Sequence, residues 1–142
     1  MLLASRDGRS VSAIHAGWRG IIAGVVPRAM ESVMQLTGVG AANLVAAIGP
    51  CIGVEHFEVG PEVVEAFDSA GLGSVMMRDG YAKPHIDLAA AVAHQLQQAG
   101  VSAEHIDRTD RCTYAREDEF FSHRRDHGRT GRQAALIAVR PG

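Results

Sequence analysis

The run HAGWRG at residues 15–20 holds the first side chains of the sequence whose types and spacing suit chemistry. The neutral imidazole of His15 can bind a metal or act as a general base, and the glycines permit a tight turn. The run is expected where a buried strand meets a helix, a place where side chains face a crevice. A hydrogen-bonded core histidine beside a packing Trp18 accounts for the same residues.

Cys51 lies in the turn GPCIG, residues 49–53, after an apolar run. Neighbouring backbone amides can lower a thiol pKa, and a cysteine hydrolase would need His15 or His56 within reach to activate Cys51. A single cysteine in such a turn is more often a small buried hydrophobe. We therefore predict that Cys51 has no histidine close enough to form a catalytic dyad.

The third chemical segment is rich in arginine. Seven of the thirteen arginines lie in residues 108–132, together with five acidic residues. Ser122, Arg124 and Arg125 stand there beside aromatic residues. Guanidinium groups bind oxyanions in a bidentate manner and rings stack on bases, so a phosphate or a base with its sugar would suit this segment. A solvated Arg–Asp network that clamps a loop fits the same residues.

Composition restricts the classes of protein that can carry these segments. The chain has 142 residues, 46% of them hydrophobic and 21% charged, which is enough for one globular domain with a core. The net charge of -2 argues against a general nucleic-acid binder. The sequence contains no apolar stretch long enough to span a membrane. Its start lacks the features of a signal peptide, and its two cysteines form no close pair, so we expect a cytoplasmic protein.

Hydrophobic periodicity and turn residues predict the elements that position these segments. A β-hairpin is expected over residues 2–5 and 10–16, with Asp7-Gly8 in a type I′ turn. The spacing over residues 21–37 predicts a helix that starts between residues 21 and 26, because Pro27 suits only a first turn or a kink. A buried strand is expected at residues 44–48 and a short one at 57–59.

The second half of the chain continues this alternation. Gly60-Pro61 predicts a helix over residues 62–67, followed by a loop over 68–84. A helix is expected over residues 86–98 with Gly100 as its C-cap, and a last buried strand over 134–139. Strands alternate with helices and the chain opens on a hairpin. The predicted fold class is therefore α+β, with a mixed sheet and packed helices.

Several motifs occur in an order that resembles one known family. They are HAGWRG, IGPCIG followed by FEVG, a helix that begins with IDL, DRCTY, and FFSHRRD with TGR. Together they resemble the YfiH-like laccase-domain family, also called the polyphenol oxidase or peptidoglycan-editing-factor family. The resemblance covers nearly the whole chain and implies one domain over residues 1–142 that lacks its N-terminal part.

The resemblance implies a zinc enzyme that acts on purine nucleosides and phosphate, by phosphorolysis of adenosine and inosine and by deamination of adenosine. The older family label is a copper phenol oxidase, but this sequence has no HxH motif of the kind that multicopper enzymes use. His15 matches one zinc ligand, and we also assign it a catalytic role. The other two family ligands, a histidine and a cysteine, match no residue here, and neither Cys51 nor Cys112 replaces them.

Four residues are the candidate substrate contacts: Arg19, Ser122, Arg124 and Arg125. Arg19 and Arg125 are the candidates for a phosphate clamp, by charge and by their place in the motifs. One histidine does not hold a catalytic zinc, which takes three protein ligands and an open position. Two alternatives therefore stay open: a catalytically silent fragment, or a subunit whose missing N-terminal half comes from another polypeptide. We further predict that His15 shares a concavity with Arg124 or Arg125.

Overall fold

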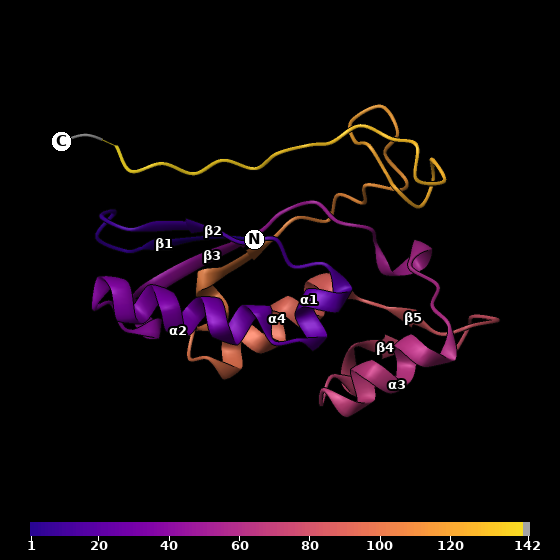
Figure 1. Cartoon of the computed structure of the whole chain (residues 1–142), viewed down its shortest axis with the longest axis horizontal. Coiled ribbons are helices and arrows are strands. Elements are labelled where there is room, and N and C mark those ends of the chain that lie inside the picture. The colour runs from indigo at the N-terminus through magenta and orange to yellow at the C-terminus, as the bar shows by residue number, and fades with distance from the viewer. Residues whose placement is uncertain (141–142) are drawn as a thin grey trace. The chain divides into compact units, whose positions relative to one another are not determined.

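The computed structural model describes residues 1–140, and the chain divides into two compact units (Figure 1). Among the described residues, the first unit contains 1–49, 92–109 and 135–140, and the second contains 50–91 and 110–134. In the described chain no helix is long and apolar enough to cross a membrane.

A four-stranded mixed sheet forms the first unit. Its strand order is β2 (Val11–Ala13), β1 (Leu2–Ser5), β3 (Leu44–Ile48) and β6 (Ile106–Arg108). Strand β1 pairs antiparallel with β2 and with β3, whereas β3 and β6 are parallel. The predicted hairpin and the predicted strand at residues 44–48 are both confirmed, and so is the α+β class with a mixed sheet.

The hairpin turn differs from the predicted type I′ turn. The N–H of Gly8 donates to the carbonyl of Ser5, and Gly8 alone in this turn has a positive φ, 72°. A type I′ turn needs a positive φ at two successive residues. Here Asp7 keeps a negative φ while its carboxylate accepts hydrogen bonds from the Ser5 hydroxyl and the Arg9 N–H. These side-chain bonds stabilise a longer connection between the strands.

Two helices follow the hairpin: α1 (Trp18–Ile22) and α2 (Val25–Thr37). Gly24 separates them with a φ of 76°, a left-handed conformation that glycine adopts without strain. Pro27 therefore lies in the first turn of α2, where a backbone N–H has no partner within the helix. The predicted helix start between residues 21 and 26, and its end beside Gly38, are confirmed for α2.

Helix α4 (Leu88–Gln98) begins two residues later than expected, because Ile86 belongs to a strand. The carboxylate of Asp87 accepts the N–H of Ala90 at 2.8 Å and so caps the start of the helix. Gly100 follows the end of α4 with a φ of 98°, as a C-cap glycine does. Within the first unit, the Gln95 side-chain amide donates to the carbonyl of Ile21 at 3.0 Å and ties α4 to α1.

The core of the first unit lies on one side of the sheet. Leu3 and Ser5 of β1 are buried, as are alternate residues of β3, whereas the residues between them are less buried. The buried residues of β3 are Leu44, Ala46 and Ile48. Figure 1 shows α2 on one side of these strands. Buried side chains of the helices, among them Met30 of α2, complete this core.

The second unit contains α3 (Pro61–Ser69) and a two-stranded sheet of β4 (Met76–Met77) and β5 (His85–Ile86). Proline at the first position of α3 confirms the predicted helix start. The predicted strand at residues 57–59 is wrong. Glu58 makes only an isolated antiparallel bridge to His85, flanked by hydrogen bonds from Val59 to Pro84 and from Ile86 to Phe57, because β5 is too short to extend the pairing. Short 3-10 turns connect the elements of the chain at Ala41–Asn43, Val54–His56, Gly73–Val75 and Ala103–His105.

The predicted last buried strand over residues 134–139 is also wrong. The segment is extended but belongs to neither sheet of the described chain, and the Leu136 side chain is 89% exposed (Figure 1). An apolar run becomes a buried strand only when a neighbouring strand supplies hydrogen bonds and a second surface covers its side chains. Within residues 1–140 this run obtains neither.

Candidate functional site

His15 lies two residues after the end of β2, in the connection that leads to α1. The hydrogen bond from the Ile14 N–H to the Met1 carbonyl, 2.9 Å, holds this connection to the start of β1. His15 is exposed, and its Nε2 lies 3.3 Å from the position that a Cβ on residue 17 would occupy. Glycine at position 17 therefore leaves the space that the imidazole uses.

Arg19 lies one turn further on, in α1, and is exposed. Its guanidinium carbon stands 4.4 Å from the ring centroid of Trp18, a cation–π contact. The indole thus supports the guanidinium from one side. The fork-shaped set of donors of Arg19 is placed in the exposed part of the helix, where a carboxylate or a phosphate can meet it.

Arg125 makes the densest set of contacts in the second unit. Its Nη1 donates to the carbonyls of Thr113 and Tyr114, at 3.0 and 3.1 Å. Its Nη2 donates to the carbonyl of Phe120 at 2.8 Å and to Asp126, while Nε donates to Asp126 at 2.9 Å. All five guanidinium N–H groups are used by these contacts. Arg125 therefore joins the segment at residues 113–114 to the segment at 120–126.

Asp126 is the acidic partner of Arg125, as in the Arg–Asp network that the sequence left open as the alternative to a substrate site. Its carboxylate accepts the Thr130 hydroxyl at 2.5 Å and the Ser122 N–H at 3.3 Å. These hydrogen bonds, the one from Thr130 first, and then the Arg125 guanidinium, lower the pKa of Asp126 below its ordinary value. Ser122 itself is buried, 5% exposed, and its hydroxyl accepts the backbone N–H of Arg125 at 3.4 Å. The carboxylate and Ser122 hold the loop in one conformation.

Arg124 points elsewhere than its neighbour Arg125. Its Nη1 donates to the carbonyl of Glu58 at 3.0 Å, and its guanidinium carbon lies 5.3 Å from the ring centroid of Phe57. The hydrogen bond from Lys83, 2.8 Å, is the main cause that lowers the pKa of Glu58. Arg124 is exposed, so most of its donors face outwards from this contact.

The two cysteines, which are 61 residues apart in the sequence, are paired through their backbones in an isolated β-bridge. Cys51 and Cys112 face each other in a parallel bridge, and the Thr113 N–H donates to the Cys51 carbonyl at 2.9 Å. The Gly53 N–H donates to Cys112 Sγ at 3.1 Å. The pairing could not be predicted from the sequence, because the two cysteines are far apart along the chain. The absence of a catalytic dyad at Cys51 stays a prediction; His56, one of its candidate partners, stacks on Tyr114 with ring centroids 4.5 Å apart.

The residues that the structure describes do not form a three-ligand zinc site by themselves. Among the described residues 1–140, no group of three histidine, cysteine, aspartate or glutamate side chains is placed to hold a metal ion. A catalytic zinc takes three protein ligands. His15 can offer one imidazole nitrogen, which is one of the three ligands that such a site takes.

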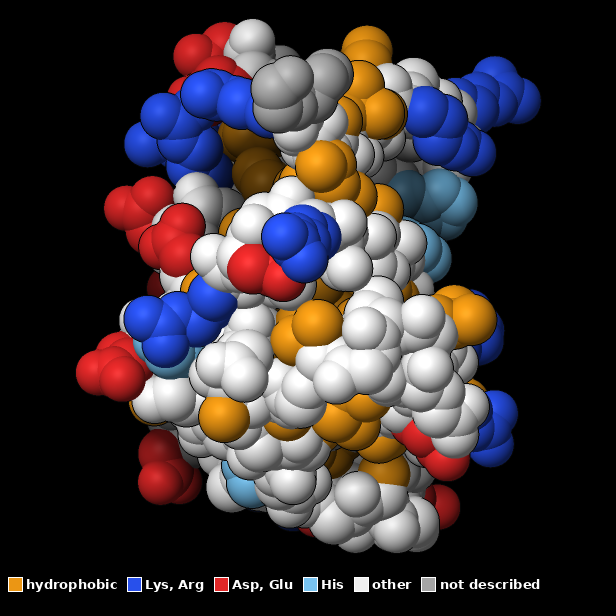
Figure 2. Space-filling view, turned by 90° about the vertical axis from the view of Figure 1, so that its left-hand side faces the viewer, with side chains coloured by type: hydrophobic (Ala, Val, Ile, Leu, Met, Phe, Trp, Pro, Cys, Tyr) orange, Lys and Arg blue, Asp and Glu red, His pale blue; other side chains and the backbone are white. Residues whose placement is uncertain are grey.

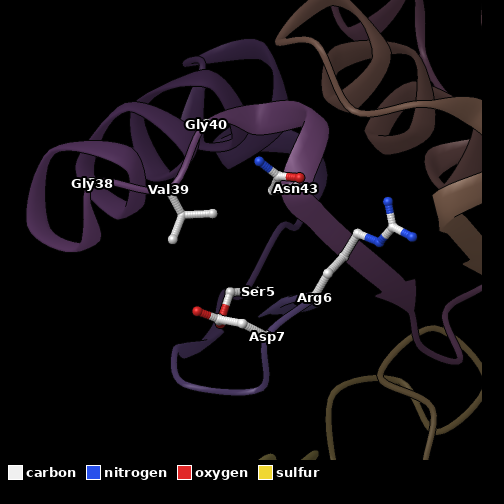
Figure 3. A pocket seen from close by; sticks show the side chains of 7 residues that line it. All are labelled: Ser5, Arg6, Asp7, Gly38, Val39, Gly40 and Asn43. Carbon is white, nitrogen blue, oxygen red and sulfur yellow. The ribbon is translucent and has the colours of Figure 1, made fainter.

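A hollow of about 560 Å³ lies in the first unit, where the hairpin turn meets the connection after α2 (Figure 3). Ser5, Asp7 and Asn43 line it, and none of the predicted site residues does. In Figure 3 the Arg6 side chain extends away from Ser5 and Asp7. The hollow is separate from the HAGWRG segment.

The structure thus places the predicted residues in two groups. His15 and Arg19 belong to the first unit, and Ser122, Arg124 and Arg125 belong to the second. Within the second group, Arg125 and Ser122 are joined through Asp126, whereas Arg124 contacts a different segment. A concavity shared by His15 and one of the arginines stays a prediction.

Comparisons with known proteins agree with the motifs. The chain is 39% identical to a purine nucleoside phosphorylase of Deinococcus radiodurans over 98% of its length, which is 53% of that relative. It is 39% identical to the purine nucleoside phosphorylase YfiH of Escherichia coli, over 96% of this chain and 54% of the relative. The protein adenosine deaminase RL5, from an unknown prokaryotic organism, is 38% identical over 92% of this chain and 52% of its own length.

Solved structures give the same result for the fold. The crystal structure of the Bacillus licheniformis hypothetical protein YfiH matches 92% of this chain and 50% of its own, with a TM-score of 0.83 and 25% identity. YlmD from Geobacillus stearothermophilus matches 85% of this chain and 46% of its own, with a TM-score of 0.74 and 32% identity. The chain therefore spans about half the length of the relatives that it matches.

A family model described as multi-copper polyphenol oxidoreductase laccase matches residues 1–140. The match covers nearly the whole chain, and it agrees with the relatives and with the order of the motifs. The chain belongs to this family, whose members include the YfiH proteins.

Proposed function

We propose that this chain is the part of a purine nucleoside phosphorylase that carries the HAGWRG motif, with deamination of adenosine as a second activity of the same enzyme. The observation that carries the proposal is the 39% identity, over nearly the whole chain, to a relative named purine nucleoside phosphorylase. The relative named adenosine deaminase supports the second activity. The substrates would be purine nucleosides and phosphate. The cysteine usage of the sequence supports the cytoplasm as the location.

The metal of this enzyme would be zinc, with His15 as one ligand and as the catalytic residue of this chain. The family description names copper. A single exposed imidazole without HxH motifs is a poor match to a multicopper site, whereas zinc accepts a site of three histidine and cysteine ligands. The other two ligands would come from the half of the family domain that lies outside the match. Bound zinc would supply a Lewis acid beside the substrate.

The four candidate substrate residues divide by their contacts. Arg19 and Arg124 are exposed, so their guanidinium groups are the ones that we propose to bind phosphate or the nucleoside directly. Ser122 is buried and Arg125 directs its donors at protein groups, so we propose that they act on substrate by fixing the loop that carries Arg124. This arrangement would present the exposed guanidinium of Arg124 from a loop that the Arg125 hydrogen bonds hold.

The second candidate function is a catalytically silent subunit that becomes active only in an assembly. The length of the chain favours it, since the relatives that it matches are about twice as long. In this form the chain would contribute His15 and the arginines, and another polypeptide would contribute the remaining ligands. The two candidates differ in whether the remaining ligands belong to the same polypeptide as this chain or to a separate one.

The experiment compares the chain alone with a fusion to the unmatched half of the Deinococcus radiodurans relative. We expect phosphate-dependent release of the base from inosine, and ammonia release from adenosine, only from the fusion loaded with zinc. His15→Ala should remove both activities and the bound zinc, while Leu36→Ala, on the exposed side of α2, should change neither. A folded, zinc-loaded fusion without either activity would refute the proposal.

A further inference from the structure

The second face of the sheet in the first unit is apolar and is not covered by the helices. Strand register places the side chains of β1 and β3 in pairs, Leu2 with Ala47 and Ala4 with Val45. These side chains alternate with the buried ones, so they point to the opposite face. Six apolar residues share this face: Leu2, Ala4, Val11, Ala13, Val45 and Ala47.

This set of six residues, which we call the bare sheet face, is only partly buried. Ala13 and Ala47 are exposed and the other four are half-buried. Its one charged neighbour in the register is Asp107, on the edge strand β6. An antiparallel sheet with one solvated face normally carries polar residues there, whereas apolar residues on both faces are typical of a sheet that is covered on both sides. The sequence of this face is therefore that of a buried surface.

A second apolar element of the same unit lacks a cover. The extended segment at residues 134–139 has the composition of a core strand, yet Leu136 and Val139 are exposed. Figure 1 draws it on the side of β1 and β2 that is opposite α2, and hydrophobic side chains are visible at the top of Figure 2. Because its side chains are exposed, the segment does not itself complete the bare sheet face. Both the bare sheet face and this segment would become buried if β structure from outside residues 1–140 packed against them.

We propose that the bare sheet face and the segment at residues 134–139 form the interface for the half of the family domain that this chain does not contain. The length of the relatives favours this partner for the interface. The chain is aligned over 98% of its own length with the Deinococcus radiodurans relative but covers only 53% of that relative. About as much sequence again belongs to the family domain. A second sheet that packs face to face, about 10 Å away, would cover the six side chains. The inference depends on the proposed function in one respect: both take the complete family domain, and not this chain alone, as the functional unit.

The test introduces a charge on the bare sheet face. Ala47 is exposed on the central strand β3, so Ala47→Arg leaves the isolated chain folded, with its guanidinium in water. Ala13→Arg repeats the change on the edge strand β2. The matched control is Leu36→Arg, which places the same charge at a side chain that is 86% exposed on α2. Circular dichroism of each isolated variant confirms the fold before binding is measured.

The binding probe is the unmatched half of the Deinococcus radiodurans relative, co-expressed as a separate tagged polypeptide. The wild-type chain and Leu36→Arg should co-purify with it in a one-to-one complex. Ala13→Arg should weaken the complex about tenfold or more, since it buries a charge that has no charged partner in the register. Ala47→Arg should weaken it as well, because its guanidinium, although opposite Asp107, must be removed from water in the complex. A complex that forms but lacks nucleoside activity would refute the proposed function and leave this inference intact.

Three results would overturn the inference. One is the absence of a complex with the wild-type chain, and another is equal binding by wild type and Ala47→Arg. The third is a homodimer of the chain alone, seen by light scattering and abolished by Ala47→Arg, which would make a second copy the occupant of the bare sheet face.

Discussion

Replacing Arg125 by alanine tests whether this side chain orders the arginine-rich segment. The substitution removes the donors that serve the carbonyls of Thr113, Tyr114 and Phe120, at 3.0, 3.1 and 2.8 Å. It also leaves Asp126 without its partner at 2.9 Å. If this network holds the loop, the first consequence is local opening of residues 111–130.

The magnitude follows from the number of bonds and from the exposure of the side chain. A hydrogen bond to a charged group contributes about 1.5–3 kcal/mol when it is well buried. The Arg125 side chain is 20% exposed, so water can replace part of what is lost. The contributions are also not additive. We therefore expect the free energy of opening this loop to fall by about 2–4 kcal/mol, which is about 30- to 700-fold in the opening equilibrium.

Hydrogen exchange followed by mass spectrometry measures this opening in peptides from residues 111–130. Arg125→Lys keeps the charge but presents its donors at one point, so it should restore less than half of the protection. The matched control is Arg124→Ala, which loses one bond at an exposed side chain and should cost less than about 1 kcal/mol. If Arg125→Ala exchanged no faster than Arg124→Ala, the argument that Arg125 clamps the loop would be refuted.

Three further predictions concern single positions. Gly53→Ala should destabilise the chain by about 1–2 kcal/mol in urea unfolding, because the new Cβ would lie 3.2 Å from the Sγ of Cys112. The control Gly49→Ala, whose Cβ would have no atom within 4 Å, should leave the stability unchanged. Equal unfolding midpoints for the two variants would contradict this prediction. Gly17→Ala should displace the His15 imidazole, 3.3 Å away, shifting its NMR resonances and weakening zinc binding in the fusion by about tenfold, without changing the melting temperature. The carboxylate of Asp126 stabilises its loop fully at pH values above the ordinary aspartate pKa of about 3.9. This stabilisation is lost as the pH falls through the lowered pKa of Asp126 in the folded chain. Hydrogen exchange in residues 120–130 should therefore accelerate in that acidic range in the wild-type chain but not in Asp126→Asn.

Much of the fold follows from local sequence. The apolar run at residues 44–48 forms β3, and Pro27 marks the first turn of α2 because its fixed φ and missing N–H suit only that position. Gly100 caps α4 in the same predictable way. These features depend on backbone chemistry within a few residues. Motif order alone also identified the family, because several motifs in sequence are more specific than any one of them.

Tertiary structure decided what depends on distant partners. Apolar composition at residues 134–139 predicts a strand, but a strand needs a neighbour, and residues 1–140 provide none. Arg125 was a candidate for phosphate, and only the folded loop shows its five N–H groups directed at carbonyls and a carboxylate. Cys51 and Cys112 become neighbours in a backbone β-bridge, because the fold pairs two segments that are distant in the sequence. Sequence sets the type of each group, and the three-dimensional fold determines which other groups come within bonding distance.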